Sequence, residues 1–314
     1  MMTDLTKVLT RDEITVYTLR SLYASHGYLQ YKMSKFEDYD LYVRNKDFLV
    51  SDNVITFTDT DGRLLALKPD VTLSIIKNHK DNPDGLIKAQ YNENVYRISG
   101  STHSFKELMQ VGLECIGSVG EKELCETVML AKKSLDAICE DNILALSQLD
   151  LISALVEYAS LSEAAEAKVL SALSGKHKAA ILEAARLDGA DAEKAELLAS
   201  LTEIMADSKT ALTALEKFRV TKKAAAAIDS LKAITDGLDA LGLTGIVIDF
   251  SLLGDMKYYN GIAIKGFINK IPESVISGGQ YDRLMAKMGR KSKAVGFAVY
   301  LDALERLPEK RGDR

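Results

Sequence analysis

The chain has few of the residues that mark a disordered or extended protein. Only 4 of its 314 residues are proline, and hydrophobic residues make up 47% against 27% charged. Segments that stay disordered combine low hydrophobicity with high net charge, so this composition excludes a largely disordered chain. A length of 314 residues exceeds one compact core of typical size, and we expect two cores or one domain that carries an insertion.

Long apolar runs and a secretory leader are also missing. The first residues include acidic side chains where a signal peptide has a basic and then an apolar stretch. No later segment approaches the run of about 18 apolar residues that a membrane helix needs. These absences predict a cytoplasmic protein without a membrane partner.

Patterns typical of metal sites and disulfides are absent as well. The cysteines Cys115, Cys125 and Cys139 lack C-x-x-C spacing and are expected as buried free thiols, and the 4 histidines have no spacing typical of a zinc site or a triad. The residue spacings therefore predict no metal site and no cofactor. Positive charge is not in excess, with 40 Lys and Arg against 45 Asp and Glu and a net charge of −5. Nucleic-acid binding relies on neutralised phosphates, so the charge balance argues against a nucleic-acid partner, while a local basic patch stays open.

The first 150 residues alternate between helical and strand-like segments. Helices are expected at 11–27, 71–80 and 121–141, and strands at 28–33, 53–59, 63–70, 88–98 and 107–118. Gly27 closes the first helix, Asp61-Gly62 marks a hairpin turn, and Pro69 precedes the second helix. This order predicts an antiparallel sheet flanked by helices.

A segment rich in Ala, Leu, Glu and Lys follows these elements. Aromatic residues almost vanish between about 153 and 241, which predicts several packed antiparallel helices. Strand patterns resume at 245–253, 261–268 and 274–279, and the run 294–307 is interpreted as a final helix. The predicted fold class is α+β, with an antiparallel sheet and an all-helical insertion. The expected boundaries are 1–150 and 244–314 for the two parts of the core and 151–243 for the insertion.

Three polar side chains on two neighbouring strands form the first candidate site. If 88–98 and 107–118 pair as antiparallel strands, Gln110 and Glu114 point to one face, and Arg97 reaches that face from the adjacent strand. A carboxylate holds an ammonium or imidazolium group, and an arginine binds a carboxylate through two parallel hydrogen bonds. These groups complement a bound amino acid. The alternative is an internal ion pair between Arg97 and Glu114.

Two further residue pairs have both a structural and a ligand-binding interpretation. Asp70 and Thr72 follow Pro69 at the start of a predicted helix, where they either cap the helix or contact a ligand. Tyr258 and Tyr259 are adjacent on a predicted strand and should point to opposite faces. One would pack in the core, and the other would present its hydroxyl to the site.

Several segments together resemble the catalytic core of histidyl-tRNA synthetases in order and spacing. They are FEDYDLY (36–42), FTDTDGRLLALKPDVT (57–72), VYRISGSTHSFKELMQVGLECIG (95–117), DMKYYNGIAI (255–264), and SGGQYDRLMAKMG with KAVGFAVYLDAL within 277–304. The resemblance covers nearly the whole chain and implies a class II synthetase fold with a helical insertion. It also implies that the family's histidine pocket is largely kept here, at Asp70, Thr72, Arg97, Gln110, Glu114, Tyr258 and Tyr259.

The positions that the family uses for ATP chemistry are changed. By the same resemblance, Gly254 and Ala303 stand where synthetases have arginines, and Leu108 replaces the phenylalanine that stacks on adenine. Removing one preorganised positive group typically costs about 3 kcal/mol of transition-state stabilisation, so the loss of two predicts no useful adenylation. The sequence also ends about 10 residues after the last matched segment, where a synthetase continues into an anticodon-binding domain. Together with the net charge of −5, this predicts no tRNA partner.

This combination is similar to the regulatory subunits of ATP phosphoribosyltransferase, which work with the short catalytic form in the first step of histidine biosynthesis. The resemblance implies a non-catalytic homodimer that assembles with catalytic subunits into a hetero-oligomer, activates them and contributes to feedback inhibition by histidine. The retained pocket either binds free histidine or is a structural relic. Two other functions stay open: a truncated or divergent histidyl-tRNA synthetase-like ligase, and a synthetase-like sensor with another partner.

Overall fold

The structure, a computed structural model, describes residues 8–45, 54–98, 103–254, 256 and 258–307. Its strands are β1 (Leu29–Gln30), β2 (Phe36–Asp38), β3 (Thr56–Thr58), β4 (Leu64–Leu67), β5 (Leu86–Ile98), β6 (Phe105–Gly117), β7 (Asn142–Gln148), β8 (Met205–Asp207), β9 (Ile246–Asp249), β10 (Asn260–Ile268), β11 (Ile276–Gln280) and β12 (Lys293–Tyr300). Its helices are α1 (Arg11–Ser25), α2 (Tyr39–Arg44), α3 (Val71–Asn78), α4 (Glu121–Ile138), α5 (Leu149–Ala159), α6 (Glu163–Ser174), α7 (Lys178–Leu187), α8 (Ala192–Ala199), α9 (Ser208–Leu215), α10 (Lys222–Ala240), α11 (Asp282–Lys287) and α12 (Leu301–Leu304).

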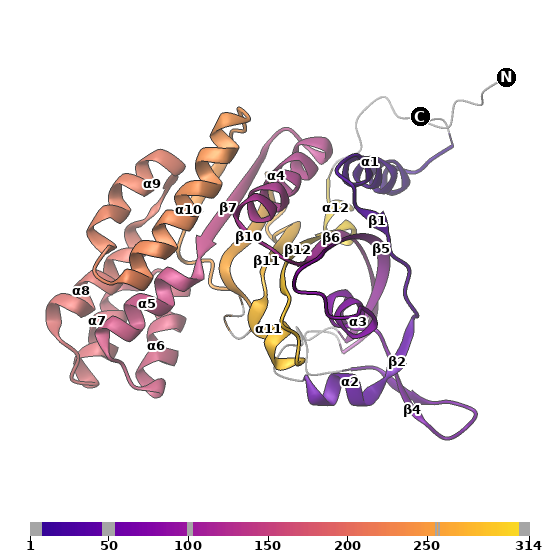
Figure 1. Cartoon of the computed structure of the whole chain (residues 1–314), viewed down its shortest axis with the longest axis horizontal. Coiled ribbons are helices and arrows are strands. Elements are labelled where there is room, and N and C mark those ends of the chain that lie inside the picture. Colours follow the sequence, from indigo (N-terminus) through magenta and orange to yellow (C-terminus); the bar gives the residue numbers. More distant parts are fainter. Residues whose placement is uncertain (1–7, 46–53, 99–102, 255, 257, 308–314) are drawn as a thin grey trace.

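The centre of the molecule is a nine-stranded sheet with the order β1-β5-β6-β12-β11-β10-β7-β9-β8 (Figure 1). The strands from β5 to β7 in this order pair antiparallel, as the sequence predicts. The pairs β1 with β5 and β7 with β9 are parallel, so the sheet contains two parallel pairs that the sequence does not predict. Parallel strands need a long crossover, and both pairs have one, through the small sheet and α3 in the first case and through α5 to α10 in the second.

Helices α1 and α4 cover one face of the sheet (Figure 1). Their apolar side chains form one core with the residues of β6 that point to this face, and the Tyr23 and Ser134 hydroxyls lie 2.9 Å apart between the two helices. The predicted end of α1 is confirmed. Gly27 has φ +84°, and the N–H groups of Gly27 and Tyr28 donate to the carbonyls of Ala24 and Tyr23.

A second sheet of three strands, in the order β2-β4-β3, accompanies α2 and α3 (Figure 1). β3 and β4 form the predicted hairpin, with Gly62 at φ +81° in its turn; residue 53 of the expected first strand lies outside the described residues. Glu37 on β2 accepts hydrogen bonds from Ser74 and Lys77 on α3. These bonds fix α3 and therefore position its N-terminal end beside the large sheet.

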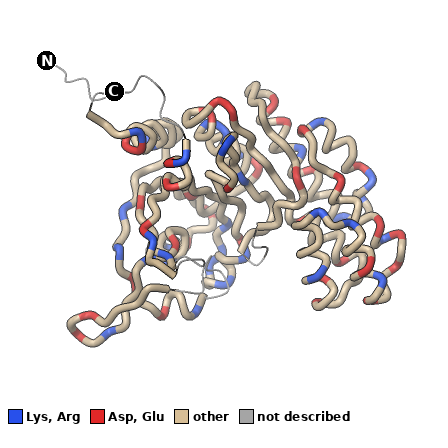
Figure 2. Tube along the Cα trace, turned by 180° about the vertical axis from the view of Figure 1, so that it is seen from behind, with Lys and Arg blue, Asp and Glu red and all other residues tan. Residues whose placement is uncertain are grey.

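Helices α5 to α10 gather at one end of the molecule, where a helical insertion is expected (Figure 1). The insertion is not entirely helical, because β8 pairs with β9 and extends the central sheet. Three residues are too few to show an alternating pattern, so the sequence does not predict β8. Lys176 also forms an ion pair of 2.9 Å with Asp249 at the end of β9. Positively and negatively charged residues are interspersed along the insertion and the rest of the described chain (Figure 2).

The first half of the run 294–307 is a strand, which corrects the prediction of a helix over the whole run. Its first part belongs to β12, and only α12 continues as a helix. β12 lies between β6 and β11, and most of its side chains are buried. A strand that is buried on both faces is apolar throughout, and periodicity alone cannot distinguish it from a buried helix. The sequence also gives no prediction of β7 or α11.

The sequence leads to expectations about cysteines, metal-binding groups and membrane-spanning helices. Cys115, Cys125 and Cys139 are free thiols, of which Cys115 is buried and the other two are half-buried. No group of three or more His, Cys, Asp or Glu side chains in the described ranges could hold a metal ion. Within the same ranges, no helix has both the length and the apolar character needed to cross a bilayer.

Candidate functional site

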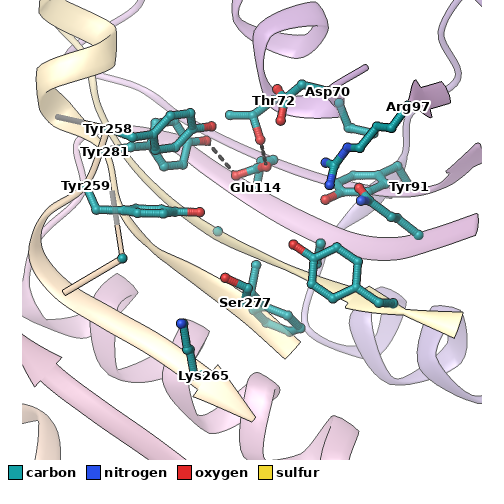
Figure 3. A pocket seen from close by; sticks show the side chains of 17 residues that line it. Asp70, Thr72, Tyr91, Arg97, Glu114, Tyr258, Tyr259, Lys265, Ser277 and Tyr281 are labelled. Atoms are coloured by element: carbon teal, nitrogen blue, oxygen red, sulfur yellow. Dashed lines mark hydrogen bonds between the residues drawn. The ribbon is translucent and has the colours of Figure 1, made fainter. Parts of the chain in front are cut away.

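A cavity of about 320 Å³ lies on the face of the central sheet opposite α1 and α4, and all the site residues predicted from the sequence line it (Figure 3). These residues are Asp70, Thr72, Arg97, Gln110, Glu114, Tyr258 and Tyr259. The N-terminal end of α3 brings the first two, β5 and β6 bring the next three, and the segment before β10 brings the tyrosine pair. The structure therefore gathers residues that are far apart in the sequence at one site.

The floor of the cavity follows one row of residues across five strands. Lys265 on β10, Ser277 on β11, Ala298 on β12, Gly112 on β6 and Tyr91 on β5 are successive partners in the register. Partners that lie side by side point to the same face of a sheet. The small residues in the middle of the row therefore leave a trough between two long side chains.

Gly296 makes room for Glu114 on the same face. The two residues are register partners on β12 and β6. A Cβ atom at position 296 would overlap with the Glu114 carboxylate and with the backbone carbonyl of Leu113. Only glycine leaves the space that the carboxylate occupies.

Glu114 is a buried carboxyl group, with 2% of its surface exposed. Its Oε1 accepts a hydrogen bond from Thr72 Oγ1 at 2.8 Å, and its Oε2 accepts one from Tyr281 Oη at 2.6 Å. Burial raises the pKa of Glu114 from 4.5 to about 8; the Tyr281 and Thr72 hydroxyls oppose this rise, and the nearby Asp70 adds to it. A cation that enters the cavity would favour the ionised form, so Glu114 is suited to bind an ammonium or imidazolium group.

Asp70 both caps a helix and lines the cavity. Its carboxylate accepts a hydrogen bond of 2.9 Å from the Leu73 N–H at the start of α3. Burial raises the pKa of Asp70, and the Leu73 N–H and the charge of Arg97 oppose this rise. The cap interpretation is therefore confirmed for Asp70, whereas the Thr72 hydroxyl donates to Glu114 instead.

Arg97 does not form the internal ion pair considered from the sequence. Its Nε donates to the Pro69 carbonyl at 3.2 Å, and its charge opposes the rise that burial causes in the pKa of Asp70. Within the described residues, no ion pair joins Arg97 to Glu114, whose oxygens accept from hydroxyl groups. Residues 99–102, which follow β5 in the sequence, lie outside the described residues. Figure 3 shows Arg97 beside Tyr91, on the other side of Glu114 from the tyrosine pair.

The tyrosine pair corrects the prediction that the two rings point to opposite faces. β10 begins only at Asn260, so Tyr258 and Tyr259 precede the strand and do not follow its alternation. Both line the cavity, with ring centroids 4.6 Å apart and ring planes at 56° (Figure 3). Gly261 at φ +57° and a shift in the register of β10 with β11 mark the irregular start of this strand.

Gly254, Ala303 and Leu108, which the resemblance indicates as changed, carry no charge into the cavity. Gly254 lines the cavity at φ +58°, and a Cβ atom there would lie 3.4 Å from the Tyr259 ring. Ala303 is buried in the core, and Leu108 packs against the apolar cluster around α3. Among the described residues, Arg97 is the only arginine that lines the cavity.

Among the described residues, five further polar side chains line the cavity that the sequence does not assign to the site: Tyr91, Lys265, Ser277, Tyr281 and Tyr300. Tyr281 follows a pair of glycines at a strand end, which is a weak signal for a nearby ligand. Lys265 and Ser277 share a face with Glu114 only through the register of β10, β11, β12 and β6. This register cannot be read from one sequence.

The raised pKa of Glu114 predicts that the stability of the ligand-free protein depends on pH. The carboxyl group has a pKa of 4.5 when unperturbed and about 8 in the folded chain, so the folded state binds more protons between these values. From this group alone, the free energy of unfolding should fall by on the order of 4 kcal/mol as the pH rises from 4.5 to 8. Urea denaturation at a series of pH values measures the effect.

Glu114→Gln tests this prediction, because the amide keeps the shape of the side chain without its charge. The variant should lose most of the dependence on pH over that window. Glu107→Gln is the matched control, since Glu107 is exposed on the same strand and should leave the dependence in place. If the free energy of unfolding changes with pH to the same extent in the parent and in Glu114→Gln, Glu114 is ionised in the folded protein and the prediction is wrong.

Sequence comparison relates the chain to two groups of named proteins. A family model described as histidyl-tRNA synthetase matches residues 6–304. A Bacillus cereus (strain AH187) protein named ATP phosphoribosyltransferase regulatory subunit is 28% identical over 296 residues, which cover 91% of this chain and 69% of that protein.

Solved structures share the fold. A Bacillus halodurans protein described as an ATP phosphoribosyltransferase regulatory subunit/histidyl-tRNA synthetase has a TM-score of 0.80 and 22% identity, over 96% of this chain and 81% of that one. A chain of the ATP phosphoribosyl transferase (HisG:HisZ) complex from Thermotoga maritima has a TM-score of 0.72 and 18% identity. The match covers 93% of this chain and 97% of that one. These similarities confirm the predicted synthetase-like α+β fold.

Proposed function

The chain belongs to the histidyl-tRNA synthetase family, and we propose that within this family it is a regulatory subunit of ATP phosphoribosyltransferase. In this role it activates the short catalytic subunit, which makes phosphoribosyl-ATP in the first step of histidine biosynthesis, and it contributes to feedback inhibition by histidine. The observation that carries the proposal is the similarity to a relative of that name over 91% of the chain. The fold shared with a chain of the Thermotoga maritima complex supports a catalytic subunit as the partner.

The charges around the cavity support a subunit without catalytic activity of its own. Adenylation of an amino acid needs preorganised positive groups around the phosphates of ATP. Gly254 brings no side chain to the cavity, and Ala303 is buried in the core. Arg97 is engaged with a backbone carbonyl and lies near the Asp70 carboxylate. These features support the loss of ATP chemistry with retention of a site for an amino acid.

The proposed ligand of the cavity is free histidine. Glu114, Gln110 and Asp70 provide a carboxyl group, an amide and a second carboxyl group for its ammonium and imidazole groups. Glu114 accepts this positive charge within a buried hydrogen-bond network, where a charged hydrogen bond is strong. A volume of about 320 Å³ lies at the lower end of the range for small-ligand sites, as a single amino acid requires.

Feedback inhibition requires that histidine binds two arrangements of the complex unequally. A ligand with the same affinity for both arrangements shifts no equilibrium, however tightly it binds. Histidine should therefore bind the less active arrangement more tightly. Titration calorimetry on the isolated subunit and on the assembled complex would reveal this difference as two dissociation constants.

The proposed role also implies an oligomeric state, a location in the cell and a set of partners. The chain would form a homodimer within a cytoplasmic hetero-oligomer with catalytic subunits, without a cofactor and without tRNA. The net charge of −5 supports the absence of a nucleic-acid partner, because phosphate binding favours basic surfaces.

Assembly with the catalytic subunit tests the proposed function. The purified chain and the short catalytic subunit from the same organism, mixed at micromolar concentrations, should elute from size-exclusion chromatography as one complex that is larger than either component. A histidyl-tRNA synthetase in place of the chain is the control and should elute separately. Separate elution of the chain itself would contradict the proposal and favour a synthetase-like sensor with another partner.

A ligase is the second candidate, because the family model describes synthetases and the cavity keeps the predicted histidine-binding residues. A ligase would exchange pyrophosphate into ATP when histidine is present. The proposed regulatory subunit should show no histidine-dependent exchange above the background without protein. Exchange at a rate comparable with that of a synthetase would establish the ligase instead.

A further inference from the structure

Lys265 lies at one end of the trough that crosses the cavity floor. Its register partners on the neighbouring strands are Ser277 and Ala145, so neither strand places a charged side chain beside it. Beyond Ser277 the row continues through Ala298, whose small side chain leaves the space above this part of the sheet open. Figure 3 shows the Lys265 amine directed into the cavity from the side opposite Glu114.

Lys265 is half-buried, and its ammonium group can pair with an anion. None of the hydrogen bonds or ion pairs among the described residues uses it. A cation that loses part of its water shell is destabilised unless an opposite charge or hydrogen-bond acceptors replace that water. An anionic group of a ligand would supply this compensation, and the hydroxyl of Ser277 would add a hydrogen bond.

Arg97 is less suited to the same task. Its Nε already donates to the Pro69 carbonyl at 3.2 Å, and its charge interacts with the Asp70 carboxylate. A carboxylate that approaches Arg97 would also approach Asp70, and like charges repel. Lys265 has no carboxylate on either neighbouring strand at its position in the register.

The separation of Glu114 and Lys265 suits a small molecule with opposite charges at its two ends. Three strand spacings, about 14 Å, separate β6 from β10 across the sheet. The two side chains span part of that distance from opposite sides of the cavity (Figure 3). A free amino acid with a cationic side chain or ammonium at Glu114 would bring its carboxylate toward Lys265.

We propose that Lys265, assisted by the Ser277 hydroxyl, binds the carboxylate of the amino acid in the cavity. This inference rests on the proposed function for the ligand, and it replaces Arg97 as the partner of the carboxylate. The cavity would therefore select the free amino acid over derivatives in which the carboxylate is reduced, esterified or amidated. Lys265 is then the residue that distinguishes free histidine from derivatives that lack the negative charge of the carboxylate.

Titration calorimetry with the full chain tests the proposal with two probes, L-histidine and L-histidinol, which has an alcohol in place of the carboxylate. The parent protein should bind histidine at least about tenfold more tightly than histidinol, as loss of one charged hydrogen bond predicts. Lys265→Met should weaken histidine binding by about 10- to 100-fold and change histidinol binding by less than about twofold. Lys265→Arg keeps the charge and should retain the preference for histidine.

Two control variants separate this role from general effects. Lys293→Met removes an exposed lysine from a strand of the same sheet, outside the cavity lining, and should leave both affinities unchanged. Arg97→Met should affect histidine and histidinol to the same degree. Far-UV circular dichroism and thermal melts establish that each variant is folded. If the preference for histidine survives in Lys265→Met or disappears in Arg97→Met, the assignment to Lys265 is wrong.

The same experiment distinguishes failure of the inference from failure of the proposed function. A parent protein that binds neither probe overturns the assignment of Lys265, while co-elution with the catalytic subunit still decides the regulatory role. A chain that co-elutes with the catalytic subunit and binds both probes equally also retains its proposed function and loses only this inference. Separate elution with Lys265-dependent histidine binding would instead support a histidine receptor with another partner.

Discussion

Glu114→Ala is expected to weaken histidine binding by about 100-fold, because the change removes the acceptor of a charged hydrogen bond inside a closed network. The Thr72 and Tyr281 hydroxyls donate to this carboxyl group, so the substitution also leaves two buried donors without their partner. Both effects reduce the affinity for a cationic group. Titration calorimetry on the parent and the variant measures the ratio of the dissociation constants.

Glu107→Ala is the matched control for this experiment. Glu107 lies on the same strand, but it is exposed and bonds to Asn94 and Tyr96 away from the cavity. Its loss should leave histidine binding unchanged. Undiminished binding by Glu114→Ala, with the variant folded, would mean that histidine is recognised elsewhere and that the cavity is a structural relic.

Gly296→Ala is expected to lower the free energy of unfolding by about 3 kcal/mol, at the upper end for overpacking of a well-packed site. The added Cβ atom would overlap with the Glu114 carboxylate and with the Leu113 carbonyl on the neighbouring strand. Glu114 can rotate away only by leaving its hydrogen bonds, and the backbone carbonyl cannot move without disturbing the sheet. Urea denaturation monitored by circular dichroism measures the change.

Gly120→Ser is the control for the loss of a glycine. A Cβ atom at position 120 would meet only Glu123, at 3.6 Å, and serine is favoured at the N-cap position that Gly120 occupies. Its unfolding free energy should stay within about 0.5 kcal/mol of the parent. An equally small effect of Gly296→Ala would show that the sheet has room for a side chain beneath Glu114.

The site residues that could be predicted from the sequence have one property in common. A pattern in the neighbouring residues determines which way each side chain points. Gln110 and Glu114 are two apart from Gly112 on one strand, and strand alternation brings all three to one face. Asp70 was recognisable as a helix cap because it precedes an apolar helical run. In both cases a few neighbouring residues contain the information.

The remaining site residues depend on contacts between distant segments. Lys265 and Ser277 share the cavity floor with Glu114 because β12 and β11 lie between β6 and β10, an order that differs from the order along the chain. Tyr258 and Tyr259 lie together because β10 begins only at Asn260, two residues after Tyr258, so strand alternation does not separate the two rings. Pairing order and irregular strand ends are decided by tertiary packing, and local sequence patterns do not contain them.

The errors in the predicted fold also come from contacts between distant segments. β12 is apolar on both faces because it lies in the middle of the sheet, and this burial removes the alternation that identifies a strand. β8 is a strand only because β9 offers it a free edge. The helices α1, α3 and α4, in contrast, begin and end close to the predicted residues, because capping residues and apolar periodicity are local signals.

The most direct test of the proposed regulatory role is the steady-state rate at which the short catalytic subunit forms phosphoribosyl-ATP as increasing amounts of the chain are added. The regulatory role predicts a severalfold rise that saturates when the complex is fully assembled, and a fall in that rate when histidine is added. A rate that stays unchanged at saturating chain would contradict the regulatory role.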